Sequence, residues 1–109
     1  MHRQEYVQCL IDTYRKTPGT TGHAYHQDRR FAEQLYDQQV PLTVVENALL
    51  LASARRLLRP DDAPPLDVIR SLHYFRPVID EVMKSTMNDD YFCYLRRKLA
   101  AIYKTHTGQ

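Results

Sequence analysis

Apolar residues recur at helical spacing in five stretches of the chain, which are separated by segments containing proline, glycine or aspartate. The stretches are residues 1–17, 26–39, 43–59, 73–86 and 90–105. In the first, the apolar stripe consists of Tyr6, Val7, Leu10, Ile11 and Tyr14, and polar residues lie largely opposite. Such a stripe is typical of a helix that buries one face. The other stripes are Phe31, Ala32, Leu35 and Tyr36; Val78, Ile79, Val82 and Met83; and Phe92, Leu95, Leu99, Ile102 and Tyr103.

The third stretch differs from the others because its run from Ala48 to Ala54 is apolar on nearly every side. A helix of this kind belongs in the middle of a bundle, and the run is too short to span a bilayer. We expect Leu49 and Ala52 to be among the most buried residues. Thr43 and Glu46 have capping-box spacing at the start, and Pro60 stops the helix.

The segments between the apolar stretches predict loops, a helical turn and the ends of helices. The segments 17–22 and 61–65 are predicted loops, and residues 67–71 are predicted to form a short helical turn. Pro77 is best placed in a first turn, so the fourth helix should begin near His73 and end around Thr86. The segment 88–90 provides a cap for the last helix.

Composition agrees with a helical fold. The chain has 109 residues, enough for one domain, and a hydrophobic share of 43% allows a real core. Only 3 glycines are present, which argues against a turn-rich β fold. The predicted fold is an all-α, compact single-domain bundle of four to five helices.

The two cysteines, Cys9 and Cys93, lie within apolar stretches, so we expect free buried thiols in preference to a disulfide. The first residues lack the apolar run of a signal peptide, and no stretch approaches the length of a membrane span. These features predict a cytoplasmic protein without a membrane partner.

No residue pattern indicates catalysis. His23 and His26 lack the further ligands that a zinc site needs, and phosphate-binding glycine motifs are absent. No histidine is placed beside Cys9 or Cys93 to serve as a base, and His73 is expected to be a packed neutral imidazole. We therefore predict no enzyme activity, no cofactor and no metal, with an unfamiliar enzyme site as the remaining alternative.

Net charge is only +2, so an interaction with nucleic acid depends on where the charges lie. Basic residues cluster near helix ends: Arg29 and Arg30; Arg55, Arg56 and Arg59; Arg96, Arg97 and Lys98. Arg97 and Lys104 share a face roughly opposite Leu95, Leu99 and Ile102. If the clusters converge in space, these side chains would bind phosphates of DNA. Alternatively, they solvate helix ends and complement helix dipoles.

The second and third stretches have the order of a helix-turn-helix. A recognition helix needs polar side chains along its exposed face, whereas the third stretch is mostly apolar and reads as a core helix. The 8 tyrosines offer other contacts: Tyr91 and Tyr94 lie near the last basic cluster and could stack on unpaired bases or anchor a protein partner. A protein–protein interaction module or homodimer is thus the alternative function.

Residues 28–84 resemble small helical proteins of bacterial mobile elements, and their layout is similar to the helical C-terminal region of DnaD-like replication proteins. The segments that carry the resemblance are 28–32, 52–56, 71–75 and 78–79, with Tyr74 and Phe75 leading the predicted helix at 73–86. The resemblance implies a non-enzymatic accessory domain that binds DNA or a replication protein, in replication or mobile-element maintenance.

Overall fold

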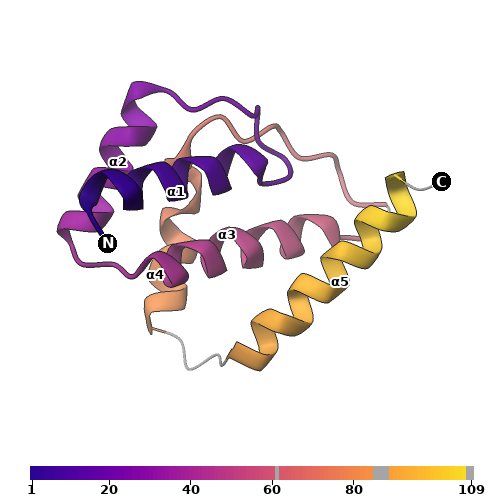
Figure 1. Ribbon diagram of the computed structural model, residues 1–109. Helices are drawn as coiled ribbons and strands as arrows, with labels where there is room; N and C mark the ends of the chain where they lie inside the picture. Colours follow the sequence, from indigo (N-terminus) through magenta and orange to yellow (C-terminus); the bar gives the residue numbers. More distant parts are fainter. Residues whose placement is uncertain (61, 85–88, 108–109) are drawn as a thin grey trace.

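The computed structural model describes residues 1–60, 62–84 and 89–107, without the side chains of 89 and 102–107. Within these ranges the chain forms five α-helices and a short 3-10 turn, η1, at Leu72–Phe75 (Figure 1). The helices are α1 (Arg3–Lys16), α2 (His26–Asp37), α3 (Leu42–Leu57), α4 (Arg76–Lys84) and α5 (Asp89–Thr107). This confirms the predicted compact all-α bundle.

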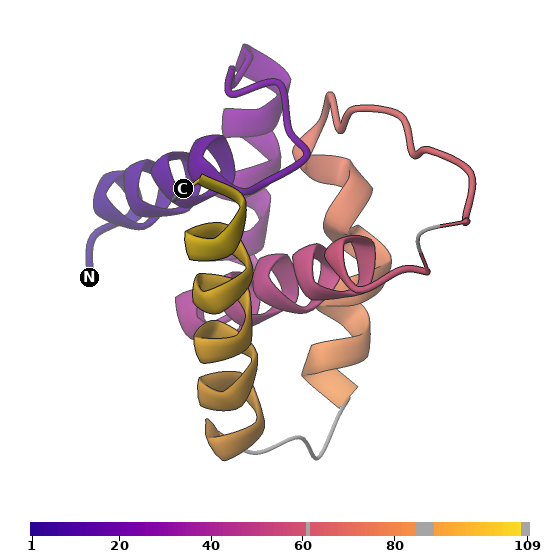
Figure 2. The same ribbon diagram turned by 90° about the vertical axis from the view of Figure 1, so that its right-hand side faces the viewer.

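Helix α3 lies in the middle of the bundle, as its apolar run predicted. It packs against α1, α4, α5 and η1, whereas α2 packs on α1 and η1 (Figures 1 and 2). The exposed fractions of Leu49 and Ala52 are 2% and 5%. When neighbours cover a helix on several sides, apolar residues on several of its faces are buried and stabilise it. This explains the composition of α3.

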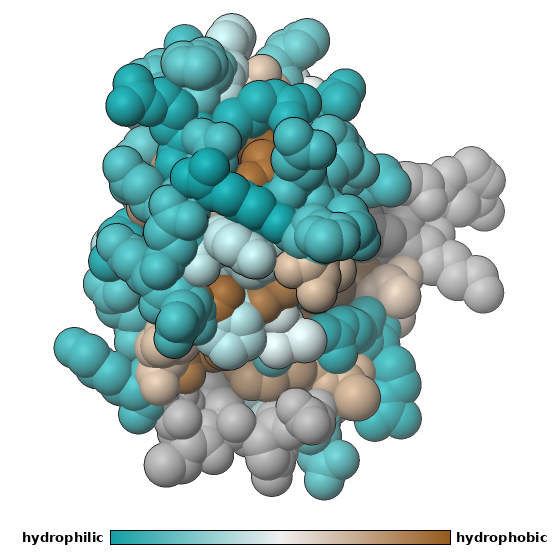
Figure 3. Space-filling model, turned by 60° about the vertical axis from the view of Figure 1, so that its left-hand side comes forward, coloured by the Kyte–Doolittle hydropathy of each residue, from teal (hydrophilic) through white to brown (hydrophobic). Residues whose placement is uncertain are grey.

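Two clusters of buried side chains meet at α3. The larger joins α1, α2, α3, η1 and α4 and contains the whole predicted stripe of α1. The smaller joins α3 to α5 and consists of Leu51, Ala54, Phe92, Leu95 and Leu99. Apolar side chains at the surface gather in a band across the face shown in Figure 3, between hydrophilic surfaces.

The prediction of a helical turn over residues 67–71 was wrong. The segment is extended, and Ile69 forms a parallel bridge with Thr20. The Ile69 amide donates to Gly19 O at 2.7 Å, and the Thr21 amide donates to Ile69 O at 3.1 Å. Pairing with a distant loop satisfies these backbone groups and buries the Ile69 side chain, and local spacing carries no signal of either.

The capping box predicted for the third helix is also absent. Pro41 occupies the N-cap of α3, and no side chain caps it. A capping box is present at α2 instead, where the Tyr25 amide donates to Asp28 Oδ2 at 2.9 Å. Asp28 Oδ1 accepts from the Leu72 amide at 2.9 Å, and Asp28 is 1% exposed. This carboxylate therefore caps α2 and ties it to η1.

The fourth helix begins later than expected, because η1 precedes α4; Pro77 is in the first turn of α4, as expected. Met83 is 49% exposed, so its predicted burial as part of the apolar stripe was wrong. The expected helix end at Thr86, the cap residue Asn88, and the side chains of Ile102, Tyr103 and Lys104 lie outside the described residues.

Both cysteines are free, as predicted, but both are exposed, which corrects the expectation of burial. Cys9 points away from the core because the buried face of α1 runs through Val7, Leu10 and Ile11. His73 packs its ring on Phe31, with centroids 4.2 Å apart, while remaining exposed on its other side.

Two buried tyrosines make a matched pair for a stability measurement. The Tyr6 hydroxyl donates to Val40 O at 2.8 Å, whereas the buried Tyr14 hydroxyl has no hydrogen-bond partner among the described residues. Burial raises the pKa of both to about 12, so both are neutral at pH 7.

We expect Tyr6→Phe to lower the free energy of unfolding by about 0.5–1.5 kcal/mol, because Val40 O loses its donor. Tyr14→Phe should leave stability at pH 7 unchanged or raise it, because it removes an unpaired buried polar group. Urea denaturation measures both. Equal losses in the two variants would show that the Tyr14 hydroxyl has a partner.

Candidate nucleic-acid interface

The basic residues expected to bind nucleic acid do not all share one surface. Arg55, in the last turn of α3, donates from both Nη atoms to the Glu81 carboxylate on α4. The hydrogen bond from Arg55 lowers the pKa of Glu81, so the carboxylate stays charged and compensates the guanidinium. Arg55 therefore links α3 to α4 and has little capacity for a phosphate.

Arg56 links the loop at Asp67 to η1 and lies against a second loop at Gly19. Its Nη2 donates to Asp67 O at 2.9 Å and its Nη1 to the Tyr74 hydroxyl at 3.1 Å. Gly19 packs so closely that a Cβ there would lie 3.0 Å from Arg56 Nε, and its φ is +89°. The positive φ favours glycine at this position, and a Cβ would also press on the Arg56 guanidinium. Arg56 positions the loops and adds positive charge to the surface around them.

Arg29 and Arg30 are exposed on α2. Arg29 lines a hollow on the side of α1, together with Arg3 and Glu33. Arg3 is itself paired with Asp37 at 2.9 Å. Acidic groups thus compensate much of the charge there, and the structure groups neither Arg29 nor Arg30 with the basic residues of α3 and α5.

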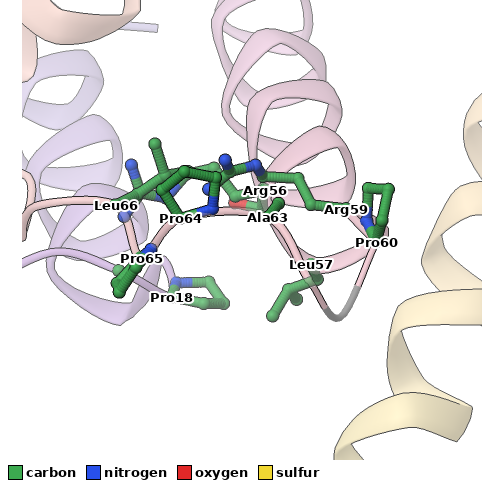
Figure 4. A pocket seen from close by; sticks show the side chains of 11 residues that line it. Pro18, Arg56, Leu57, Arg59, Pro60, Ala63, Pro64, Pro65 and Leu66 are labelled. Atoms are coloured by element: carbon green, nitrogen blue, oxygen red, sulfur yellow. The ribbon is translucent and has the colours of Figure 1, made fainter.

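Arg56 and Arg59 line a hollow of about 320 Å³ at the C-terminal end of α3, which we call the end hollow. Figure 4 shows both side chains along one side, with Pro18 and Leu57 across from them. The remaining wall comes mainly from the proline-rich loop that follows α3. Its lining residues are Pro18, Gly19, Ser53, Arg56, Leu57, Arg59, Pro60, Ala63, Pro64, Pro65 and Leu66.

A second hollow of about 340 Å³, here called the cleft, adjoins the first, and Pro18 and Ser53 line both. Leucines of α3 and α5 contribute its apolar lining, and α1 and α5 contribute Lys16 and Arg96. Arg96 donates to Asn47 Oδ1 at 2.9 Å, a neutral partner that leaves its charge uncompensated. The lining residues are Thr13, Lys16, Thr17, Pro18, Glu46, Leu49, Leu50, Ser53, Arg96 and Leu99.

The end hollow and the cleft together form one basic surface, carrying Lys16, Arg56, Arg59 and Arg96. Among the described residues that line it, Glu46 is the only acid. Lys16 was not among the basic residues that were predicted from the sequence to bind phosphates. It joins the surface because α1 and α3 end on the same side of the bundle (Figure 1). The surface therefore carries positive charge at the C-terminal ends of two helices, where the cations also offset the negative ends of the helix dipoles.

Arg97 and Lys98 lie on the exposed part of α5. Lys98 Nζ donates to the Tyr94 hydroxyl at 3.2 Å, and Tyr94 is 48% exposed. The helical spacing of α5 places Tyr94 and Lys98 on the flank away from Arg96. These residues do not line either hollow.

Three further features bear on function. The buried residues Val45, Ala48, Leu49, Leu51 and Ala52 of α3 leave no continuous polar face to read base edges as a recognition helix. In the described part of the chain, no three His, Cys, Asp or Glu side chains come together as a metal site. None of the described helices is long and apolar enough to cross a membrane.

Comparison with known proteins adds no relative: no family model, curated protein or solved structure matches this chain.

Proposed function

We propose that this protein is a non-enzymatic nucleic-acid-binding accessory domain that holds backbone phosphates on the basic surface of the end hollow and the cleft. The observation that carries the proposal is the grouping of Lys16, Arg59 and Arg96 from three helix regions around adjoining hollows, opposed by Glu46 alone among the described lining residues. Phosphate contacts need such uncompensated cations and do not need a recognition helix.

The chemistry of the side chains supports this assignment. The side chains of Lys16 and Arg59 have no hydrogen-bond or ion-pair partner in the described part of the chain, and the side-chain bond of Arg96 is to a neutral amide. Binding a phosphate therefore requires no ion pair to be broken. A role in replication or mobile-element maintenance remains a prediction from the resemblance, and a cytoplasmic location remains a prediction from the sequence.

The proposal is tested by removing two charges from the surface. We expect Arg59→Gln/Arg96→Gln to reduce the slope of log affinity against log salt on duplex DNA by about 1.8, at about 0.9 per lost phosphate contact. Fluorescence anisotropy with a labelled oligonucleotide at several salt concentrations measures the slope. The matched control, Arg29→Gln/Arg30→Gln, removes the same charge from α2 and should change the slope far less.

Two results would count against the proposal. If both double variants reduce the slope equally, binding is spread over the whole molecule and the basic surface is not a site. If the unmodified protein shows no binding at about 50 mM salt, where phosphate contacts are strong, nucleic-acid binding itself is wrong.

A protein partner or a second copy is the other candidate, favoured by exposed apolar residues at the same end of the molecule. Leu57 and Leu66 line the end hollow and are 38% and 46% exposed, and Leu58 is 44% exposed. The outer side of α3, by contrast, is covered by α5 and is not free to bind a partner. Light scattering at high concentration distinguishes a dimer from a monomer.

A further inference from the structure

The cleft has an apolar interior as well as a basic rim. Leu50 on α3 is half-buried and contributes apolar lining, whereas Leu49 and Leu99 line the cleft with only 2% and 6% of their surfaces exposed. Helix α5 packs on α3 and leaves the space beside α1 unfilled. Backbone phosphates alone would use Lys16 and Arg96 and leave the apolar lining in contact with water. A ligand that matches both features combines an apolar group with negative charge.

The hydroxyl groups of the cleft are already used within helices. Thr13 Oγ1 donates to Cys9 O at 2.9 Å, Thr17 Oγ1 to Thr13 O at 2.7 Å, and Ser53 Oγ to Leu49 O at 2.8 Å. Their protons are thus committed to backbone carbonyls. The inner surface of the cleft offers mainly methyl and methylene groups to a ligand, with few donors to select one pattern of polar atoms over another.

We propose, building on the function proposed above, that the cleft takes an unpaired base and that the domain therefore prefers single-stranded nucleic acid. In a duplex the base faces are stacked inside, whereas a single strand can turn a base outwards between two bound phosphates. The base covers the exposed part of Leu50 and lies beside the Arg96 guanidinium, which stacks on flat rings. Lys16 and Arg59 then hold phosphates on either side.

The charges around the cleft and the internal hydrogen bonds of its hydroxyl groups favour an unpaired base as the ligand. Among its described residues, the surface has one acid, Glu46, and three cations outside any ion pair, namely Lys16, Arg59 and Arg96. This excess of positive charge suits a chain with one negative charge per nucleotide. The lack of free hydroxyl donors predicts little preference among the bases, because every base has an apolar face. An acidic amphipathic helix of a partner protein is the competing occupant, and the experiment below separates the two.

The test compares three ligands at one salt concentration: a single strand of about 12 nucleotides, an abasic strand with the same phosphates, and a duplex of equal length. We expect the strand with bases to bind about tenfold more tightly than the abasic strand, which corresponds to about 1.4 kcal/mol. Thr13→Leu, which fills the cleft without changing charge, should remove this difference. Thr43→Leu, at an exposed position of α3, should preserve it.

The results distinguish failure of base insertion from failure of the proposed phosphate binding. Equal, salt-dependent binding of all three ligands overturns base insertion but leaves phosphate binding intact. Persistence of the tenfold difference in Thr13→Leu also overturns it, provided that circular dichroism shows the variant folded. Absence of binding to every oligonucleotide, together with binding of an acidic amphipathic peptide that Thr13→Leu abolishes, assigns the cleft to a protein partner.

Discussion

Replacing Leu49 with alanine is expected to lower the free energy of unfolding by roughly 2–5 kcal/mol. Leu49 is 2% exposed and belongs to the larger cluster on the central helix. The substitution removes apolar contacts and leaves a cavity that α3, held by neighbours on several sides, cannot close by moving. Since natural domains are stable by only about 5–15 kcal/mol, this one side chain carries a large part of the total.

Chemical denaturation monitored by circular dichroism measures this loss. The matched control is Leu58→Ala, because Leu58 follows the same helix but is 44% exposed. The control should change stability by less than about 0.5 kcal/mol. A loss of the same small size for Leu49→Ala would mean that α3 is not the centre of the bundle.

Replacing Asp28 with alanine is the second substitution with a large expected effect. Its carboxylate accepts the Tyr25 amide at 2.9 Å and the Leu72 amide at 2.9 Å, and the residue is 1% exposed. Alanine would leave a buried amide at η1 without an acceptor and remove the cap of α2. We expect a loss of roughly 2–4 kcal/mol, the sum of an unpaired buried donor and a lost cap.

The same denaturation experiment includes two comparisons. Asp28→Asn keeps one acceptor oxygen and should lose less than alanine. Asp80→Ala removes a carboxylate that is 52% exposed and paired with Arg76 on the surface, and it should cost little. If Asp28→Ala and Asp80→Ala have the same stability, the link between α2 and η1 contributes nothing and the role assigned to Asp28 is wrong.

The helices were largely predictable from the sequence, and the errors have specific causes. The stripe of α1 is buried at all five predicted positions, because helical spacing alone places those side chains on one face. Cys9 and Met83 were misplaced because an apolar residue at the edge of a stripe is buried only if a neighbouring helix covers it. The segment 67–71 was misassigned because its partner, Thr20, is far away in the chain.

Only some of the residues of the candidate site were predictable from the sequence, and their arrangement was not. The arginine clusters of α3 and α5 are visible in the sequence, and Arg59 and Arg96 do line adjoining hollows. The pairing of Arg55 with Glu81 was not predictable, because it depends on how α4 packs beside α3. Lys16 was missed because its role requires α1 and α3 to end on the same side.

The order of hydrophobic and polar residues was sufficient to specify five helices, their inward faces and the central place of α3, since those properties depend on residues a few positions apart. The basic surface and the cleft depend on the packing directions of α1, α3 and α5. Those directions follow from contacts between residues distant in the chain, which a local pattern does not contain. Such contacts leave some arginines uncompensated and pair Arg55 with a carboxylate.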